Sequence, residues 1–332
     1  MKPTPAIIPP HLTLHTANGE EASLNALFSN LPNQTPWRGR LAPTPSGYLH
    51  RGNIMNFLLN WLVLRISGGE VGLRIDDMDP TRSRPEYIEA IFTTLDWLGL
   101  DWDFGPQTVA EQKKFSFQTE QAGLQTLAES LLEKGLAYAC DCTRKQLQGQ
   151  GPTYPGHCRN LNKPWQPGIN TLRLAAYKLA HPQNWPQKTQ QAGLSARLPN
   201  MPPVDDTVIW SRDNYASYQL ASVWRDEHDR ISLLIRGADL LDSSRFQNVL
   251  AQALQLKHYP QTAVWHHPLL TDDHGHKLAK STGSQAHPLP ESGLHPAELI
   301  RQFAGWIGLP EHSVALLGTL HDLRHALEDS LP

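Results

Sequence analysis

The segment of residues 39–53, with the sequence GRLAPTPSGYLHRGN, contains residue types that can bind a phosphate. Its turn, residues 43–52, has two prolines and two glycines and precedes a long apolar run. If that run is a helix, its first N–H groups and the positive end of its dipole can hold an anion. His50 in the turn can donate a hydrogen bond to a phosphate as negative charge develops. The alternative is a plain corner between a strand and a helix.

The hydrophobic pattern predicts the elements that position this turn. Residues 37–42 form an expected strand, residues 54–66 are nearly all apolar and long enough for a buried helix, and residues 71–75 form a second strand. A strand, a helix and a second strand in this order form a right-handed unit with parallel strands. The sequence therefore predicts an α/β fold whose ligands bind at the carboxyl ends of parallel strands.

Charged residues follow two of the expected strands. Asp76 and Asp79 come after the second strand, where carboxylates can hold an ammonium group, a ribose or Mg²⁺. A further strand at residues 231–235 ends in Arg236 and Asp239. The alternative for the aspartates is an acidic surface loop.

The rest of the chain carries weaker patterns. No element is predicted for residues 105–118. The expected helices and strands follow the apolar spacing and the positions of Gly, Pro and Ser. Helices are expected at 85–98, 124–135, 296–307 and 313–327, and a further helix is expected to begin with Ser243 or Ser244 as its cap and to run to residue 254. Segments that favour strands are expected at 207–210, 216–224 and 263–265. A charged turn is expected at 225–230.

Two lysines, Lys277 and Lys280, lie on a loop at residues 272–284 that is flanked by glycines. Such a loop could close over a triphosphate, and its point charges would then stabilise a phosphoryl- or nucleotidyl-transfer transition state. The alternative is a solvated basic loop.

Three cysteines, Cys140, Cys142 and Cys158, lie in a compact segment rich in Gly and Pro. Three thiolates and a fourth ligand can coordinate zinc tetrahedrally, and His157 and Tyr154 are the candidates for the fourth position. Chemistry alone favours His157, because His is much the commoner zinc ligand. The alternative is three inert buried thiols.

Composition narrows the class of protein. The chain has 332 residues and a net charge of −3, so any contact with a nucleic acid must come from a local basic patch. An odd number of cysteines does not favour a disulfide scaffold and fits a reducing cytosol. No signal-peptide pattern and no apolar run of the roughly 18–20 residues of a membrane span is visible. We therefore expect a cytoplasmic protein without membrane contact.

Several of these segments together resemble class I aminoacyl-tRNA synthetases of the glutamyl group. Residues 43–53, PTPSGYLHRGN, resemble the HIGH motif, and residues 277–281, KLAKS, resemble the KMSKS loop. Residues 73–80, LRIDDMDP, and residues 235–239, IRGAD, match strand-end motifs of that group in the same order. The resemblance implies a Rossmann-like, parallel-sheet catalytic core with a zinc-binding insertion and a short helical C-terminal part.

Within that group, residues 37–284 resemble the glutamyl-queuosine tRNA(Asp) synthetases, a family with the glutamyl catalytic core and no anticodon-binding domain. We expect the 48 residues after Ser284 (332 − 284) to be too few for such a domain. The implied division is a leader at 1–36, the two halves of the catalytic core at 37–135 and 205–270, the zinc-binding and loop-rich insertion at 136–204, and the KMSKS-like loop with the helical part at 271–332.

The resemblance also implies a set of site residues. The family's zinc site has two Cys, a Tyr and a Cys, which match Cys140, Cys142, Tyr154 and Cys158 and favour Tyr154 over His157. The implied glutamate-binding residues are Arg40, Leu41, Ala42, Pro43, Thr44, Asp76, Tyr218 and Arg236. The implied ATP-binding residues are Pro43, Gly47, His50, Gly52, Asn53 and Lys280, and the implied catalytic residues are His50, Lys277 and Lys280.

Chemistry agrees with two of these assignments. Arg236 can hold a side-chain carboxylate through a bidentate pair, which selects glutamate over glutamine, and Asp76 can hold the α-ammonium group. The resemblance then implies activation of L-glutamate by ATP and Mg²⁺ without tRNA, followed by transfer of glutamate to queuosine at the wobble position of tRNA(Asp), by a monomer. The alternatives are a short glutamyl-tRNA synthetase that charges a tRNA 3′ end, and a nucleotide- or zinc-binding module without catalysis.

The chain departs from the family's pattern at four places. Asp76 stands where Glu is usual, so its carboxylate falls about one methylene short, and Ala279 stands where Ser is usual. Asn53 takes the fourth position of the HIGH motif, and the usual Ser-Gln-Arg is missing from residues 107–117. The first and last departures bear on the geometry of the amino-acid substrate.

Overall fold

The computed structural model describes residues 13–15, 21–23, 36–151, 153–179, 204–269 and 287–328. The first two stretches are the strands β1 (Thr13–His15) and β2 (Glu21–Ser23), which pair antiparallel. Most of the leader, the loop-rich part of the insertion and the predicted KMSKS-like loop lie outside the described residues.

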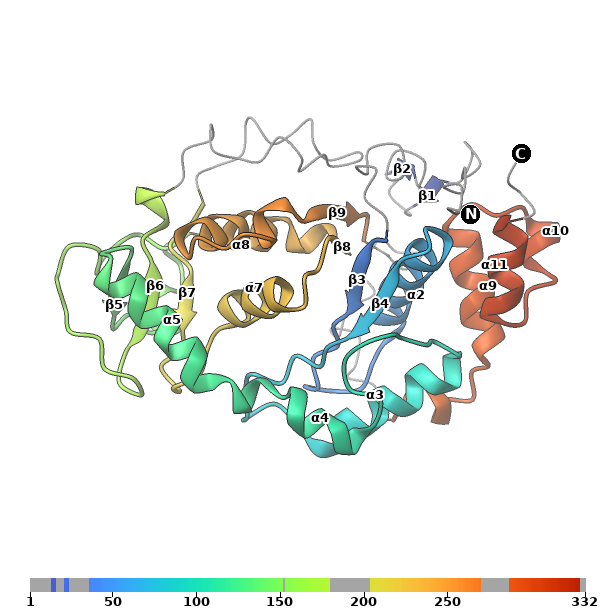
Figure 1. The fold of residues 1–332 in the computed structure, drawn as a ribbon, viewed down its shortest axis with the longest axis horizontal. Helices are drawn as coiled ribbons and strands as arrows, with labels where there is room; N and C mark the ends of the chain where they lie inside the picture. Colours follow the sequence, from blue (N-terminus) through green and yellow to red (C-terminus); the bar gives the residue numbers. More distant parts are fainter. Residues whose placement is uncertain are drawn as a thin grey trace.

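Two parallel strand pairs form the centre of the molecule. β3 (Arg38–Leu41) pairs with β4 (Glu70–Leu73), and β8 (Leu233–Gly237) pairs with β9 (Ala263–His267). The backbone N–H of Ser232 donates to the carbonyl of Arg38 at 2.8 Å, so β8 lies beside β3. The strand order across the centre is therefore β4, β3, β8, β9 (Figure 1). The predicted parallel unit around the turn is confirmed.

Helix α2 (Arg51–Ile66) connects β3 to β4 and is buried along most of its length. One side packs on the strands, and the other side is covered by α9 (Pro296–Trp306) and α11 (Leu320–Glu328) (Figure 1). A helix that is covered on all sides needs apolar residues on all sides, which explains the unbroken apolar run. The helix starts three residues earlier than the sequence predicts, because His50 caps it.

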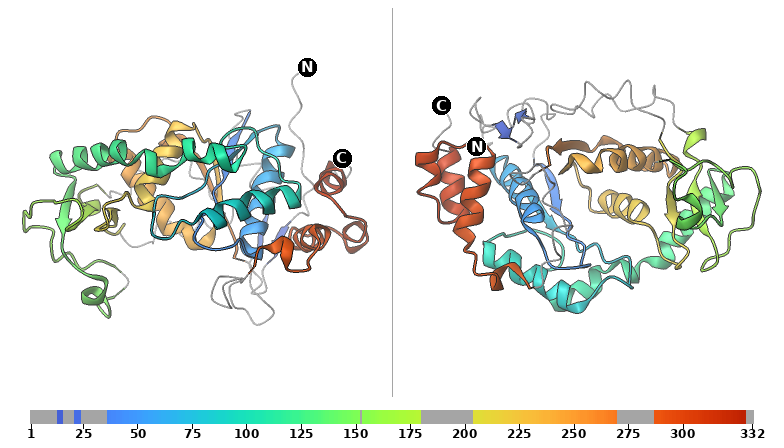
Figure 2. Two further views of the ribbon diagram at one scale, coloured as in Figure 1. Left: turned by 90° about the horizontal axis from the view of Figure 1, so that it is seen from below. Right: turned by 180° about the vertical axis from the view of Figure 1, so that it is seen from behind.

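A second group of elements extends away from this centre. Helices α3 (Pro85–Leu98), α4 (Val109–Phe115) and α5 (Gln121–Glu133) lead to an antiparallel sheet of β5 (Ala137–Cys140), β6 (Thr171–Leu174) and β7 (Val208–Trp210). Short helix α6 (Arg144–Leu147) follows β5. This sheet and the C-terminal helices lie at opposite ends of an elongated molecule (Figures 1 and 2).

Three predictions about elements are wrong. The segment from Ala216 to Arg230, expected to be β-prone and then a turn, is mainly helix α7 (Tyr218–His228), which Ser217 caps by accepting a hydrogen bond from the Leu220 N–H. Helix α8 (Leu241–Ala253) begins before Ser243 and Ser244, which therefore are not its cap. The expected helix at 313–327 is two helices, α10 (Glu311–Val314) and α11.

Helices α7 and α8 pack together in a second apolar cluster with α5 and β7, so tertiary burial overrides the β propensity of the residues in α7. Short 3₁₀ turns complete the described chain at Phe117–Thr119, Ala176–Lys178, Ala238–Leu240, Tyr259–Gln261 and Leu289–Glu291. None of the helices in the described stretches has the length and apolar content that crossing a bilayer requires.

Candidate active site and metal centre

A cavity of about 510 Å³, which we call the inner cavity, opens where β3 and β8 end and α2 begins. This is the place at which a parallel α/β fold presents its ligand-binding loops. The structure brings together most of the residues that were proposed from the sequence. Those that line the inner cavity are Arg40, Ala42, Thr44, His50, Gly52, Asn53, Asp76, Tyr218 and Arg236.

Three of the predicted residues that the structure describes do not line this cavity, and two others are not described. Leu41 is fully buried in the core, and Gly47 is not among the residues that line the cavity. The carbonyl of Pro43 accepts a hydrogen bond from the Asp76 N–H at 2.8 Å, so Pro43 positions a residue that does line it. Lys277 and Lys280 lie outside the described residues.

One buried carboxylate, Asp226 on α7, connects three arginines below the inner cavity. Its two oxygens accept from Arg40 Nε at 2.6 Å and Nη2 at 3.0 Å. Arg74 Nη1 donates to Oδ1 at 2.6 Å, and Arg236 Nη2 donates to Oδ2 at 3.5 Å. Burial alone would raise the pKa of Asp226, but the charges of Arg40, Arg74 and Arg236 outweigh it and lower that pKa to about 2. Asp226 is therefore ionised at neutral pH.

Arg74 also holds Asp76, with Nε donating at 2.7 Å and Nη2 at 3.3 Å. The three arginines and two aspartates of this cluster are each at most 8% exposed, and their formal charges (3 − 2) leave one positive charge in excess. We call them the buried charge cluster. A buried excess charge is costly unless an anion accompanies it. The exposed carboxylate of Asp239 also lines the inner cavity, so the attraction for an anion is local to the buried arginines and does not extend over the whole wall.

Arg236 is the arginine of the cluster with the longest contact to a carboxylate, 3.5 Å from Nη2 to Asp226 Oδ2. Its Nη1 donates to Ser244 Oγ at 3.0 Å and to Gln247 Oε1 at 2.5 Å. Its buried Nε has no hydrogen-bond partner among the residues that the structure describes. A guanidinium with a spare donor in the wall of a cavity is suited to a carboxylate.

His50 lies at the N-terminus of α2, beside this cluster. Its Nδ1 accepts from the Asn53 N–H at 3.3 Å, while Asn53 Oδ1 accepts from the His50 N–H at 3.1 Å. Because Nδ1 is an acceptor, the neutral imidazole carries its proton on Nε2. The first turn of α2 thus offers backbone N–H groups, a helix dipole and an imidazole donor to an anion.

The three cysteines form a compact cluster whose sulfur atoms all lie within 4.8 Å of one another. Cys142 and Cys158 are 3.7 Å apart, and two sulfurs on one tetrahedral zinc at about 2.3 Å would be about 3.8 Å apart. Burial alone would raise the pKa of Cys140, but hydrogen bonds with Tyr154 and Arg173 lower it to about 7, whereas burial and the neighbouring Cys158 and Cys140 raise the pKa of Cys142. The donor set fits a tetrahedral metal ion.

The structure also separates the two candidates for the fourth ligand. The Tyr154 hydroxyl lies 3.3 Å from Cys140 Sγ and 3.6 Å from Cys142 Sγ. The His157 side chain is exposed, and its Nε2 contacts Gln150 Oε1 at 2.7 Å. Tyr154 is the residue positioned to complete the site.

Sequence reasoning missed Asp226 and gave Arg74 no role. It assigned residues 225–230 to a turn, in which Asp226 would be one charge among several. The spacing of Tyr218, Ser222 and Asp226, four residues apart, would have shown a shared face had the segment been treated as a helix. His267 also lines the inner cavity and was not singled out.

Comparison with known proteins agrees with this fold. Residues 37–314 match the family described as "tRNA synthetases class I (E and Q), catalytic domain". The chain is 38% identical over 259 residues to the glutamyl-Q tRNA(Asp) synthetase of Ectopseudomonas mendocina, covering 78% of this chain and 82% of that protein. It is 36% identical over 295 residues to the protein of the same name from Pseudomonas fluorescens, covering 84% of this chain and 93% of that one.

Solved structures show the same fold. The glutamate-tRNA synthetase of Elizabethkingia anophelis matches with a TM-score of 0.59 at 20% identity, over 81% of this chain and 61% of that one. A glutamate tRNA ligase of Elizabethkingia meningosepticum in complex with its amino acid matches with a TM-score of 0.59 at 18% identity, over 87% of this chain and 64% of that one. This chain therefore spans less than two thirds of each of those enzymes.

The class that the fold and the family match define is that of the class I tRNA synthetases for glutamate and glutamine. The chain belongs to this family and, within it, to the glutamyl-Q tRNA(Asp) synthetases, and it is a ligase.

Proposed function

We propose that this ligase activates L-glutamate with ATP in the absence of tRNA and transfers it to queuosine at the wobble position of tRNA(Asp). The observation that carries the activation step is the excess positive charge of the buried charge cluster, with a spare Arg236 donor at the wall of the inner cavity. The names of the related proteins support the choice of tRNA(Asp) as the acceptor.

The glutamate side chain would enter the inner cavity and place its carboxylate on Arg236, which compensates the excess charge. Glutamine has no such charge and would leave the cluster uncompensated, so the cavity selects glutamate. Asp76 lies in the wall shared with Tyr218 and would accept the α-ammonium group. Arg74 holds Asp76 in place through two hydrogen bonds, which fixes the reach of this short carboxylate.

Activation would join the two substrates at the N-terminus of α2. An oxygen of the glutamate α-carboxylate attacks the α-phosphorus of ATP, the bond to the bridging oxygen breaks, and pyrophosphate leaves with its electron pair. His50 Nε2–H and the first N–H groups of α2 would stabilise the negative charge on the phosphate oxygens. Lys277 and Lys280, with the Mg²⁺ that enters on ATP, would neutralise the departing pyrophosphate.

Transfer would then consume the glutamyl-adenylate. A hydroxyl of the queuosine cyclopentenediol attacks the acyl carbon, an ester bond forms, and the bond between that carbon and the AMP oxygen breaks. The hydroxyl proton leaves with AMP. Zinc bound by Cys140, Cys142, Cys158 and Tyr154 would have a structural role, because the four ligands leave no open position for a substrate.

The activation step is tested by glutamate-dependent exchange of radioactive pyrophosphate into ATP without tRNA. We expect exchange in the wild type and a loss of about 100-fold in kcat/KM for glutamate in Arg236→Ala, because a charge-assisted bidentate contact contributes about 3 kcal/mol. Arg84→Ala, an exposed arginine outside the inner cavity, is the control. Equal activity of the two variants would refute the role of Arg236.

A further inference from the structure

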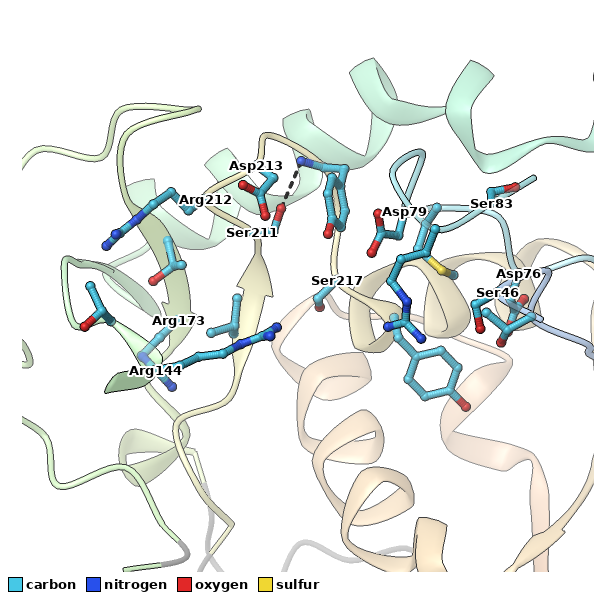
Figure 3. A pocket seen from close by; sticks show the side chains of 18 of the residues that line it. Ser46, Asp76, Asp79, Ser83, Arg144, Arg173, Ser211, Arg212, Asp213 and Ser217 are labelled. Atoms are coloured by element: carbon cyan, nitrogen blue, oxygen red, sulfur yellow. Dashed lines mark hydrogen bonds between the residues drawn. The ribbon is translucent and has the colours of Figure 1, made fainter. Parts of the chain in front are cut away.

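A second and larger cavity lies beside the inner cavity, on the side of the β5–β7 sheet. This outer cavity has a volume of about 720 Å³ and shares Thr44, Asp76 and Tyr218 with the inner cavity. A group held in the outer cavity could therefore reach an acyl group held in the inner one. One wall comes from the loops after β3 and β4, and the other comes from the β5–β7 sheet and the segments that follow its strands (Figure 3).

The two walls differ in charge. Figure 3 shows Arg144, Arg173 and Arg212, with Asp213 beside the last of them, on the side of the β5–β7 sheet, facing Asp76 and Asp79 across the cavity. Arg173 and Arg212 are already engaged, since Arg173 Nη1 donates to the Asp206 carbonyl and Arg212 Nη2 donates to the Asp141 carbonyl, both at 2.7 Å.

Arg144 differs from Arg173 and Arg212 in its contacts. Its exposed side chain forms no hydrogen bond or ion pair with any residue in the described part of the chain. An unpaired arginine at the rim of a cavity next to an acyl-transfer site is suited to an anion on the acceptor. On an RNA acceptor, that anion is a backbone phosphate.

The position of Arg144 is fixed by its neighbours in sequence. Cys142 belongs to the cysteine cluster, and Thr143 caps the short helix α6 that begins at Arg144. Thr143 Oγ1 accepts from the Gln146 N–H at 3.2 Å, and Gln146 Oε1 accepts from the Thr143 N–H at 2.8 Å. The guanidinium is thus attached to a firmly held backbone and not to a long loop.

We propose that the outer cavity receives one unstacked nucleotide of a single-stranded RNA loop and that Arg144 contacts a phosphate next to that nucleotide. This inference rests on the proposed function for the identity of the acceptor. A single nucleotide fits because proteins read RNA loops by splaying out individual bases, whereas a duplex would hold the base in its stack. Arg144 thereby positions the acceptor strand and takes no part in glutamate activation.

The test is equilibrium binding of a fluorescently labelled anticodon stem-loop RNA of tRNA(Asp), measured by anisotropy at several salt concentrations. We expect Arg144→Ala to bind about tenfold more weakly than the wild type. We also expect its slope of log affinity against log salt to be smaller by about 0.7, the value for one phosphate contact on a single strand. Lys145→Ala, which removes the next charge on the same helix but lies outside the cavity, is the matched control and should keep the wild-type slope.

A second measurement separates this inference from the proposed function. Transfer of labelled glutamate to the free queuosine nucleoside, which has no phosphate, should proceed equally in Arg144→Ala and the wild type. Transfer to the queuosine-containing stem-loop should be slower in the variant at subsaturating RNA. An Arg144→Ala variant with the affinity and salt slope of Lys145→Ala would overturn the phosphate contact, whatever acceptor the wild type uses. Absence of transfer to any queuosine acceptor in the wild type would instead contradict the proposed function and leave the binding test valid.

Discussion

Asp226 contacts arginines from three separate parts of the sheet and lies beneath the inner cavity without lining it. Asp226→Asn keeps the shape of the side chain but removes its charge. The buried arginines then repel one another, and the Arg236 side chain is no longer held in position. We expect the KM for glutamate in pyrophosphate exchange to rise about tenfold or more, while the KM for ATP changes little. The physical reason is that Asp226 contacts arginines proposed to bind glutamate, and no residue at the N-terminus of α2, where we propose that ATP binds.

A purely structural role for Asp226 would give a different result. Breaking a buried pair costs about 3–5 kcal/mol, so the variant should also unfold at a lower urea concentration. A general loss of structure would lower both affinities and kcat together. Ser222→Ala removes the hydrogen bond that Ser222 Oγ accepts from Arg74 and the one that it donates to Asp226, and it leaves every charge in place, so it serves as the mild comparison. Equal changes in the KM for glutamate and for ATP would contradict the assigned positioning role.

For single residues, the sequence indicates by type and motif which side chains can form a site, but it does not show which residues they contact after folding. Arg236 and Asp76 were found because they follow apolar strands, where ligands gather. The link between them runs through Asp226, which is 10 residues from Arg236 but 152 from Arg74 and 186 from Arg40 in the chain, and contacts all three only after folding. No local pattern reports such a contact.

Strand β9 ends in two buried histidines, His266 and His267, whose neutral forms suit their surroundings. His267 Nδ1 donates to the Pro268 carbonyl at 2.7 Å, which leaves Nε2 as the acceptor for Asn56 Nδ2 at 2.8 Å. Burial lowers the pKa of His267 to about 4, and burial together with the Arg236 charge lowers that of His266 to about 3. An unfolded histidine has a pKa of about 6.5.

These histidines predict how stability depends on pH. Below about pH 6.5 the unfolded chain binds protons that the folded chain does not, so the free energy of unfolding falls as the pH drops from about 6.5 towards 4. Urea unfolding at pH 7.5 and pH 5.0 measures the fall, which we expect to be smaller in His267→Gln than in the wild type. The same fall in both proteins would show that His267 is not protonated on unfolding.

The cysteine cluster belongs to the β5–β7 sheet. Its metal content can be tested by substituting its residues one at a time. We expect Cys158→Ser to bind less than one zinc per chain by metal analysis and to melt at a lower temperature, since a structural metal contributes directly to folding. Tyr154→Phe should weaken zinc retention against a chelator, whereas His157→Ala should retain zinc like the wild type. Full zinc occupancy in Cys158→Ser would refute the site, and zinc loss in His157→Ala would restore His157 as the ligand.

Elements with a strong and uniform pattern could be predicted from the sequence. The strands β3 and β4 and the helix α2 were found because an apolar run and a Gly-Gly stop leave few alternatives. Helix α7 was not found, because its Tyr, Val and Trp favour strands and its helical state depends on packing against α5 and α8. Helix α4 lies in a stretch with no clear period and was left without a prediction.

The inner cavity is lined by the strand centre and helix α7, whereas the outer cavity is also lined by residues of the β5–β7 sheet and the segments next to its strands. The C-terminal helices lie at the opposite end of the molecule from that sheet (Figures 1 and 2). The inner cavity is lined by the residues that we propose to bind glutamate and ATP, and the outer cavity, which we propose for the acceptor, shares three lining residues with it. Both candidate acceptors, queuosine and a tRNA 3′ end, present a hydroxyl for the same acyl transfer. Family membership and fold therefore indicate the type of reaction, but they do not distinguish between the two acceptors.

The most direct test is transfer of labelled glutamate to tRNA(Asp) that carries queuosine, compared with the same tRNA that carries an unmodified guanosine at the wobble position. The account predicts label only on the queuosine-containing tRNA, and the label should survive periodate oxidation of the 3′ end beforehand. Label on the unmodified tRNA that periodate treatment abolishes would contradict the account and identify a 3′-charging enzyme.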